Sequence, residues 1–139
     1  MHIRFYEKQL PPEAVEIRNT VFVKEQGFVD EYDEIDDIAT HFVMYDAHIP
    51  IATCRIFLKD TPCTYYLGRF AVVKAYRGRH VGTRLMEAVE NYVRCCGGHL
   101  IRLHAQAAAA GFYSAVGYMS EGDPDEEQGC PHCWMIKTV

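Results

Sequence analysis

The sequence has no apolar run that approaches the roughly 20 residues needed to span a bilayer. Its N-terminal segment, MHIRFYEKQLPPE, also lacks the basic stretch followed by an apolar stretch that marks a secretory signal. We therefore expect a cytoplasmic protein that does not associate with membranes. Because thiols stay reduced in the cytosol, the six cysteines are expected to be free rather than paired in disulfides.

Positive charge is also in short supply. The chain has 14 Lys and Arg residues against 19 Asp and Glu, which gives a formal net charge of -5 at pH 7. A phosphate backbone would be repelled by such a surface, so we exclude nucleic acid as a partner. No internal repeat, low-complexity tract or linker interrupts the 139 residues. The sequence therefore predicts a single domain over residues 1–139.

Apolar patterning predicts an α/β fold with a mixed sheet. Strands are expected at residues 2–6, 40–46, 51–59, 64–74, 99–105 and 133–139, and helices at 13–26, 81–96 and 107–117. The consecutive strands between residues 40 and 74 indicate an antiparallel meander. The order strand 64–74, helix 81–96, strand 99–105 indicates a parallel βαβ crossover. Gly68 marks an expected β-bulge.

The segment AYRGRHVGTRLMEAVENYV, residues 75–93, joins a glycine-containing turn to an amphipathic helix. The first N–H groups of a helix have no partner within it, and the positive helix end favours an anion. Arg77 and Arg79 would add charge-assisted contacts to phosphate oxygens. The turn is thus either a phosphate site or an exposed basic turn. It has neither the Gly-Lys-Ser/Thr of a Walker loop nor the dinucleotide-binding fingerprint.

Two motifs in register resemble the GNAT family of N-acetyltransferases. RGRHVG, residues 77–82, is similar to that family's acyl-CoA pyrophosphate loop, and AAAAGFYSAVGY, residues 107–118, is similar to its later helical motif. VFVKEQGF, DEIDD and THF further resemble an ElaA/YjcF-like bacterial subgroup. The resemblance covers nearly the whole chain. It implies the GNAT acyl-CoA N-acyltransferase fold, with antiparallel N-terminal strands and the parallel βαβ junction at the CoA site.

The resemblance also implies a reaction and a set of site residues. The reaction is transfer of an acetyl group from acetyl-CoA to a primary amine of a small-molecule acceptor, by direct attack in a ternary complex. The implied CoA-binding residues are Phe70, Ala71, Val72, Arg77, Gly78, Arg79, His80, Val81, Gly82 and Gln106. Main-chain groups of residues 70–72 would bond the pantetheine arm as an added strand does. Tyr113 matches the family tyrosine near the CoA sulfur and would protonate the departing thiolate; its alternative role is a core aromatic.

His80 stands where the family pattern more often has glycine. If the position needs a positive φ, a side chain there costs stability or contacts. If φ is negative, histidine fits and its ring faces a phosphate. The backbone angle therefore decides between the two interpretations.

The acceptor side has no residue with a unique signature. Glu25, Asp36, His41 and His132 are candidate acceptor-site residues, although each also fits a structural role, and a water relay would make a dedicated base unnecessary. The acidic run Asp30–Asp37 is expected to be a loop beside the acceptor site. Part of its negative charge would attract a cationic amine.

We expect no metal. Cys130-Pro131-His132-Cys133 lacks the second ligand pair of a structural zinc site, so this stretch is predicted to be a turn before the last strand. The acidic run lacks EF-hand spacing. Two alternative functions stay open: a non-catalytic acyl-CoA-binding or sensory module, and acetylation of a protein N-terminus or lysine. A homodimer is the default assembly.

Overall fold

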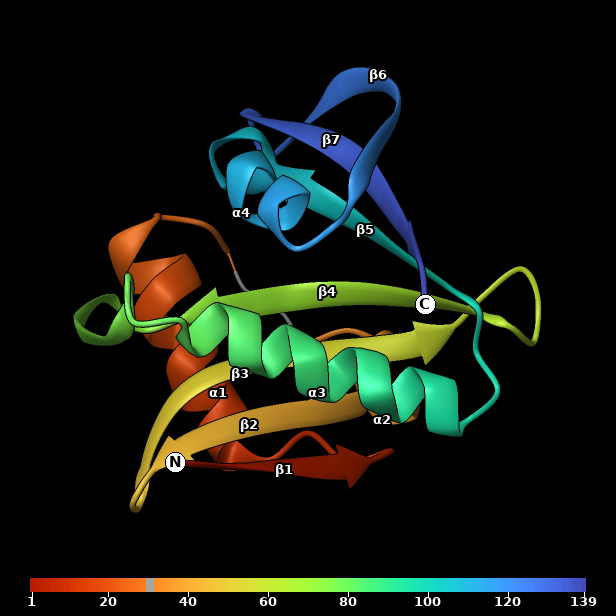
Figure 1. Ribbon diagram of the computed structural model, residues 1–139. Helices are drawn as coiled ribbons and strands as arrows, with labels where there is room; N and C mark the ends of the chain where they lie inside the picture. Colours follow the sequence, from red (N-terminus) through yellow and green to blue (C-terminus); the bar gives the residue numbers. More distant parts are fainter. Residues whose placement is uncertain (30–31) are drawn as a thin grey trace.

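A computed structural model describes the chain at residues 1–29 and 32–139. Its main feature is a seven-stranded sheet in the order β1-β2-β3-β4-β5-β7-β6 (Figure 1). The strands are β1 (His2–Glu7), β2 (Thr40–Asp46), β3 (Ile49–Leu58), β4 (Thr64–Val72), β5 (Leu100–Gln106), β6 (Met119–Glu127) and β7 (Cys130–Thr138). Strands β4 and β5 are parallel and are connected through α3 (Val81–Cys95), whereas the other neighbouring pairs are antiparallel. The predicted mixed sheet with its βαβ junction is confirmed.

Short helical segments occupy several connections. They are α1 (Pro12–Arg18), η1 (Asn19–Glu25), α2 (Ile35–Ile38), η2 (Lys74–Tyr76), η3 (Ala107–Ala109) and α4 (Ala110–Ala115). The helix predicted over residues 13–26 is α1 followed directly by η1, which is π-helical. Pro12 begins α1, where no N–H donor is needed, and Gly27 follows the helical stretch with φ +74°. No helix in the described residues is long and apolar enough to cross a bilayer.

The alternation of side chains along β2 supplies a core to both faces of the sheet. Phe42 and Met44 belong to the larger buried cluster, which α3 covers with its apolar stripe. Val43 and Tyr45 belong to a smaller cluster that α1 covers. Figure 1 shows α3 and α1 on opposite sides of the sheet. The strands are thereby packed between helices on either side.

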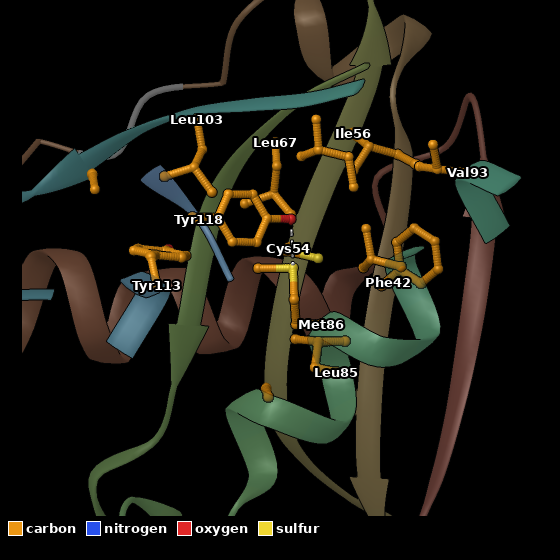
Figure 2. Close-up of a cluster of buried hydrophobic side chains, with 14 of the residues drawn as sticks. Phe42, Cys54, Ile56, Leu67, Leu85, Met86, Val93, Leu103, Tyr113 and Tyr118 are labelled. Atoms are coloured by element: carbon orange, nitrogen blue, oxygen red, sulfur yellow. Dashed lines mark hydrogen bonds between the residues drawn. The ribbon is translucent and has the colours of Figure 1, made fainter. Parts of the chain in front are cut away.

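Figure 2 shows the larger cluster, where Cys54, Met86 and Tyr118 lie close together. The Tyr118 hydroxyl donates to Met86 Sδ at 3.3 Å. Complete burial raises the pKa of the Cys54 thiol, so this cysteine stays protonated and packs as an apolar side chain. All six cysteines are free thiols, as the sequence predicts.

Two features near the C-terminus differ from the prediction. Residues 119–127 form β6, which the sequence pattern did not predict. The strand is exposed along its whole length, so no buried alternation reveals it, and its register with β7 shifts between Glu121 and Asp125. Residues 130–133 were predicted to be a turn but begin β7. The turn lies before them, at Gln128 and Gly129, which both have positive φ.

Candidate active site

The parallel strands β4 and β5 separate halfway along their length. They pair from Thr64 with Leu100 to Leu67 with Leu103, yet β4 continues to Val72 and β5 to Gln106. A bulge bends β4 where the pairing stops, because Arg55 of β3 faces Gly68 while Thr53 faces Ala71. This is the bulge predicted at Gly68, although the positive φ, +52°, belongs to Arg69.

Two cavities meet at this opening. One, which we call the α3 cavity, has a volume of about 420 Å³ and lies against the start of α3. The other, the sheet cavity, has about 460 Å³ and lies against β3, β4, β5 and β7. Phe70, Ala109 and Tyr113 line both. A ligand bound in one cavity would therefore meet a ligand bound in the other at these side chains.

The α3 cavity gathers most of the predicted CoA-binding residues. Its lining is Phe70, Val72, Tyr76, Arg77, Gly78, His80, Val81, Gly82, Thr83, Ala109, Phe112 and Tyr113. Of the other predicted residues, Ala71 is buried in the smaller core cluster, Arg79 stacks over the Tyr76 ring at 4.7 Å, and Gln106 lines the sheet cavity. Tyr76, Thr83, Ala109 and Phe112 were not predicted, although Ala109 and Phe112 lie within the AAAAGFYSAVGY motif.

The backbone at the start of α3 is shaped to present its N–H groups. Gly78 has φ +73°, and His80, the residue preceding α3, has φ +60° in the left-handed region. The Arg84 N–H is bonded to the His80 carbonyl at 3.1 Å, whereas the N–H groups before it belong to the first turn, which has no partner within a helix. Gly82 allows Phe112 to pack here, since an added Cβ would lie 3.2 Å from its ring. The positive φ at His80 selects the interpretation in which its side chain costs stability.

Arg77 is held in place by two elements. Its Nε donates to the Val72 carbonyl at 2.9 Å, and its Nη2 donates to Glu25 Oε1 at 2.7 Å. The hydrogen bond from Arg77 lowers the pKa of Glu25. Glu25, a candidate acceptor-site residue, therefore lies beside the predicted phosphate-binding arginine and is not part of the sheet-cavity lining.

Tyr113 is buried at the junction of the two cavities. It is 7% exposed, and its ring packs edge-on against Phe70, Phe112 and Tyr118. Burial raises its pKa above the usual range, and the nearby Cys54 adds to the shift. The phenol is therefore protonated at neutral pH and can act as a proton donor.

The sheet cavity has an aromatic and polar lining. It includes Phe57, Tyr66 and Trp134 together with Arg55, Lys59, Arg69, His104, Glu127 and His132. Two hydrogen bonds connect the segment after η1 to β5 and to the turn between β6 and β7. Gln106 donates to the Gln26 side chain at 2.9 Å, and the Val29 N–H donates to the Gln128 side chain at 3.2 Å.

Asp36 lies in a buried ion-pair network and lines neither cavity, although its partner Arg55 lines the sheet cavity. Arg18 and Arg55 donate to its Oδ1 at 2.9 and 2.8 Å. Burial acts to raise the pKa of Asp36, but these hydrogen bonds and charges outweigh it and lower the pKa to about 2. Arg55 also bonds Asp33, at 2.7 Å. The charges of Asp33 and Asp36 are thus neutralised by arginines rather than offered to a cationic acceptor.

His41 is a further buried partner in this network. Its Nε2 donates to the Asp36 carbonyl at 3.0 Å, and burial lowers its pKa, so the ring is neutral. His132 alone among the four acceptor candidates lines the sheet cavity. The remaining acidic residues of the run include Asp30 and Glu31, which lie outside the described residues.

Sequence reasoning did not single out Arg55, His104 or Trp134, which also line the sheet cavity. Their only signal is an alternating position in β-rich runs. That signal marks a face of a strand but not what the face borders.

Comparisons of the sequence and of the fold with known proteins find several that are similar to this chain. A family model described as "Acetyltransferase (GNAT) domain" matches residues 7–139. The uncharacterized N-acetyltransferase YjcF of Bacillus subtilis is 34% identical over 134 residues, covering 94% of each chain. The crystal structure of Escherichia coli ElaA matches with a TM-score of 0.82 and 26% identity, covering 98% of this chain and 99% of that one. An aminoglycoside 6'-N-acetyltransferase solved with coenzyme A shares the fold, with a TM-score of 0.77, 16% identity and coverage of 99% and 97%.

Proposed function

Since this chain belongs to the GNAT acetyltransferase family, we propose that it transfers an acetyl group from acetyl-CoA to a primary amine of a small-molecule acceptor. Transfer of an acyl group from acyl-CoA follows from the family. The acetyl group, the amine and the role of each residue are the proposal. The observation that supports them best is the meeting of two cavities at Phe70, Ala109 and Tyr113.

In this proposal acetyl-CoA occupies the α3 cavity. The pyrophosphate binds the N–H groups at the start of α3, where the helix end favours an anion. The pantetheine arm runs along β4 beyond Leu67, where this strand has left β5 and can accept an added strand. The coenzyme A bound to the structurally similar aminoglycoside enzyme supports CoA binding by this fold.

The acceptor enters from the sheet cavity, so its amine approaches the thioester at the junction. The neutral amine nitrogen attacks the thioester carbonyl carbon, and the carbon–sulfur bond then breaks. Tyr113 gives its hydroxyl proton to the leaving sulfur, while the proton of the amine passes to water. Main-chain N–H groups of β4 polarise the carbonyl oxygen. Holding both substrates together supplies much of the acceleration.

We do not assign a general base. His132 lines the sheet cavity, but its two ring nitrogens are directed at the Cys130 carbonyl and the Glu127 carboxylate. Glu25, Asp36 and His41 are engaged elsewhere, as described above. A water relay through the sheet cavity needs none of them.

Amine-dependent release of CoA tests the proposal. Purified protein is incubated with acetyl-CoA and a panel of primary amines, and free thiol is followed with a chromogenic reagent. We expect release above the hydrolysis background with at least one amine, and a matching acetylated product by mass spectrometry. Saturable acetyl-CoA binding without amine-dependent release would instead support the non-catalytic binding module. Preference for longer acyl-CoA would overturn the acetyl assignment alone.

A further inference from the structure

Two histidines and one glutamate converge in the lining of the sheet cavity. His104 lies on β5, Glu127 ends β6, and His132 lies on β7. A ring nitrogen of each histidine and a carboxylate oxygen all lie within 4.8 Å of one another. From the sequence, the motif at residues 130–133 lacked partners for a metal site. The fold brings His104 and Glu127 to its histidine.

Hydrogen bonds fix which ring atoms of the two histidines face Glu127. His132 Nδ1 donates to the Cys130 carbonyl at 2.8 Å, and its Nε2 lies 3.5 Å from Glu127 Oε2. His104 Nε2 donates to Asp125 Oδ1 at 2.7 Å, and its Nδ1 lies 3.7 Å from the same Glu127 oxygen. In neutral rings both facing nitrogens carry lone pairs. Metal-binding histidines are oriented in this way, by a carbonyl or carboxylate on the far nitrogen.

The rings are not free to turn away from this contact. His132 is 5% exposed. The His104 ring lies between those of His132 and Trp134, with centroid distances of 4.7 Å to each. With both rings neutral, two lone pairs and a carboxylate face one another here, and they repel unless a proton or a metal ion lies between them. Glu127 is the exposed member, so its side chain can adjust to such a cation.

We propose that His104, Glu127 and His132 bind one divalent transition-metal ion of the Zn²⁺ type. Two imidazoles and a carboxylate are a known ligand set for this class. Tetrahedral bonds of about 2.1 Å would separate ligand atoms by about 3.4 Å, and the two nitrogen–oxygen distances are 3.5 and 3.7 Å. Because all three residues line the sheet cavity, the remaining coordination position faces it. The proposed metal site does not depend on the proposed acyl transfer, so an experiment can overturn one proposal and leave the other standing.

Direct titration tests the site. Tag-free protein treated with a chelator is titrated with Zn²⁺ by calorimetry, and Co²⁺ binding is followed by its visible absorption. We expect one saturable site in the wild type. His104→Ala and His132→Ala should raise the dissociation constant on the order of 100-fold or more, because each removes a ligand. Asp125→Asn should raise it about 10- to 100-fold, because it loosens the orientation of His104.

Control variants separate this cluster from the cysteines and from general surface charge. The double variant Cys130→Ser/Cys133→Ser keeps the main-chain carbonyl that orients His132, so it should bind Zn²⁺ as the wild type does. Glu126→Gln makes the same charge change next to Glu127 and should have no effect. Glu127→Gln should bind Zn²⁺ more weakly than the wild type. Because the position is exposed, the fold should be intact and the far-UV circular dichroism unchanged.

Two results would overturn the proposal. The first is the absence of saturable Zn²⁺ binding in the wild type, which would mean that a proton rather than a metal ion lies among the three side chains. The second is binding that survives Glu127→Gln but disappears in the double cysteine variant, which would place the ion on the thiols.

Discussion

Arg77 and Glu25 are 52 positions apart in the chain, yet they form a two-point ion pair that joins the turn before α3 to the end of η1. The guanidinium that is proposed to bind the CoA pyrophosphate is thus already engaged by a carboxylate. Ligand binding must either displace Glu25 or use the Arg77 donors that remain.

Removing the carboxylate should help CoA binding. In Glu25→Gln the Arg77 guanidinium loses its ionic partner and becomes available to phosphate, so we expect the dissociation constant of acetyl-CoA to fall a few-fold. Arg77→Gln should raise it about tenfold, since a charge-assisted contact is lost. Calorimetric titration with acetyl-CoA measures both. Glu16→Gln, an exposed carboxylate on α1, is the matched control. If Glu25→Gln weakens binding as much as Arg77→Gln, the pair acts as one unit that positions Arg77.

Tyr113→Phe should lower kcat by about 10²- to 10⁴-fold, the usual contribution of a positioned proton donor, with acetyl-CoA affinity unchanged. Tyr118→Phe is the control, because the Tyr118 hydroxyl bonds Glu90 and Met86 rather than lining either cavity. Turnover of Tyr113→Phe at the wild-type rate would remove the proposed role.

The pH profile gives an independent check on Tyr113. Burial raises the pKa of this phenol, so it stays protonated beyond the pH of about 10 at which a free tyrosine ionises. Wild-type kcat should therefore show no loss from tyrosine deprotonation as pH rises toward about 10. A decline that disappears in Tyr113→Phe would contradict this.

His80→Gly should stabilise the protein by up to about 1 kcal/mol, because glycine adopts a positive φ without the cost that a side chain incurs. Acetyl-CoA affinity should stay equal or become tighter. His80→Ala separates the two effects, since it removes the ring but keeps a Cβ at φ +60°. Thermal unfolding and CoA titration measure the outcome. A large loss of affinity in both variants would mean that the imidazole itself holds the ligand.

Asp36→Asn should destabilise the fold by about 3–5 kcal/mol, since it leaves the buried Arg18 and Arg55 without their shared carboxylate. Asp37→Asn, at an exposed position, is the control and should have little effect. Urea unfolding at neutral pH measures both variants. Equal urea midpoints for Asp36→Asn and the wild type would show that the network makes no net contribution to the free energy of unfolding.

Acid should weaken the wild type through the same carboxylate. The pKa of Asp36 in the folded protein, about 2, lies below the ordinary aspartate value of 3.8. The stabilisation is therefore fully present above pH 3.8 and is lost as pH falls through about 2. The shift corresponds to about 2 kcal/mol. Urea midpoints measured from about pH 5 downward should fall less steeply in Asp36→Asn than in the wild type.

The sheet and the α3 turn could be predicted because their signals are local. The stripe from Val81 to Val93 marks one face of a single helix, and the turn before it lies a few residues away. The same holds for the alternation in β2, where successive residues enter opposite cores. Such patterns need no knowledge of what the face contacts.

The acceptor side could not be predicted because its contacts are long-range. Asp36 resembles its acidic neighbours in sequence, and only Arg18 and Arg55, which come from other elements, explain its burial. His104 meets His132 only because β5 pairs with β7. Strand β6 is hidden by Gly122 and Pro124, residues that ordinarily indicate a loop.

Strand β6 also bears on how copies of this protein can associate. It forms one margin of the sheet, and its residues 119–127 include five carboxylates and a proline. An antiparallel partner added there would set carboxylates against carboxylates and would meet a position without an N–H donor. This margin therefore resists the edge-to-edge growth by which exposed strands aggregate, and a homodimer of this chain would have to be built on another surface.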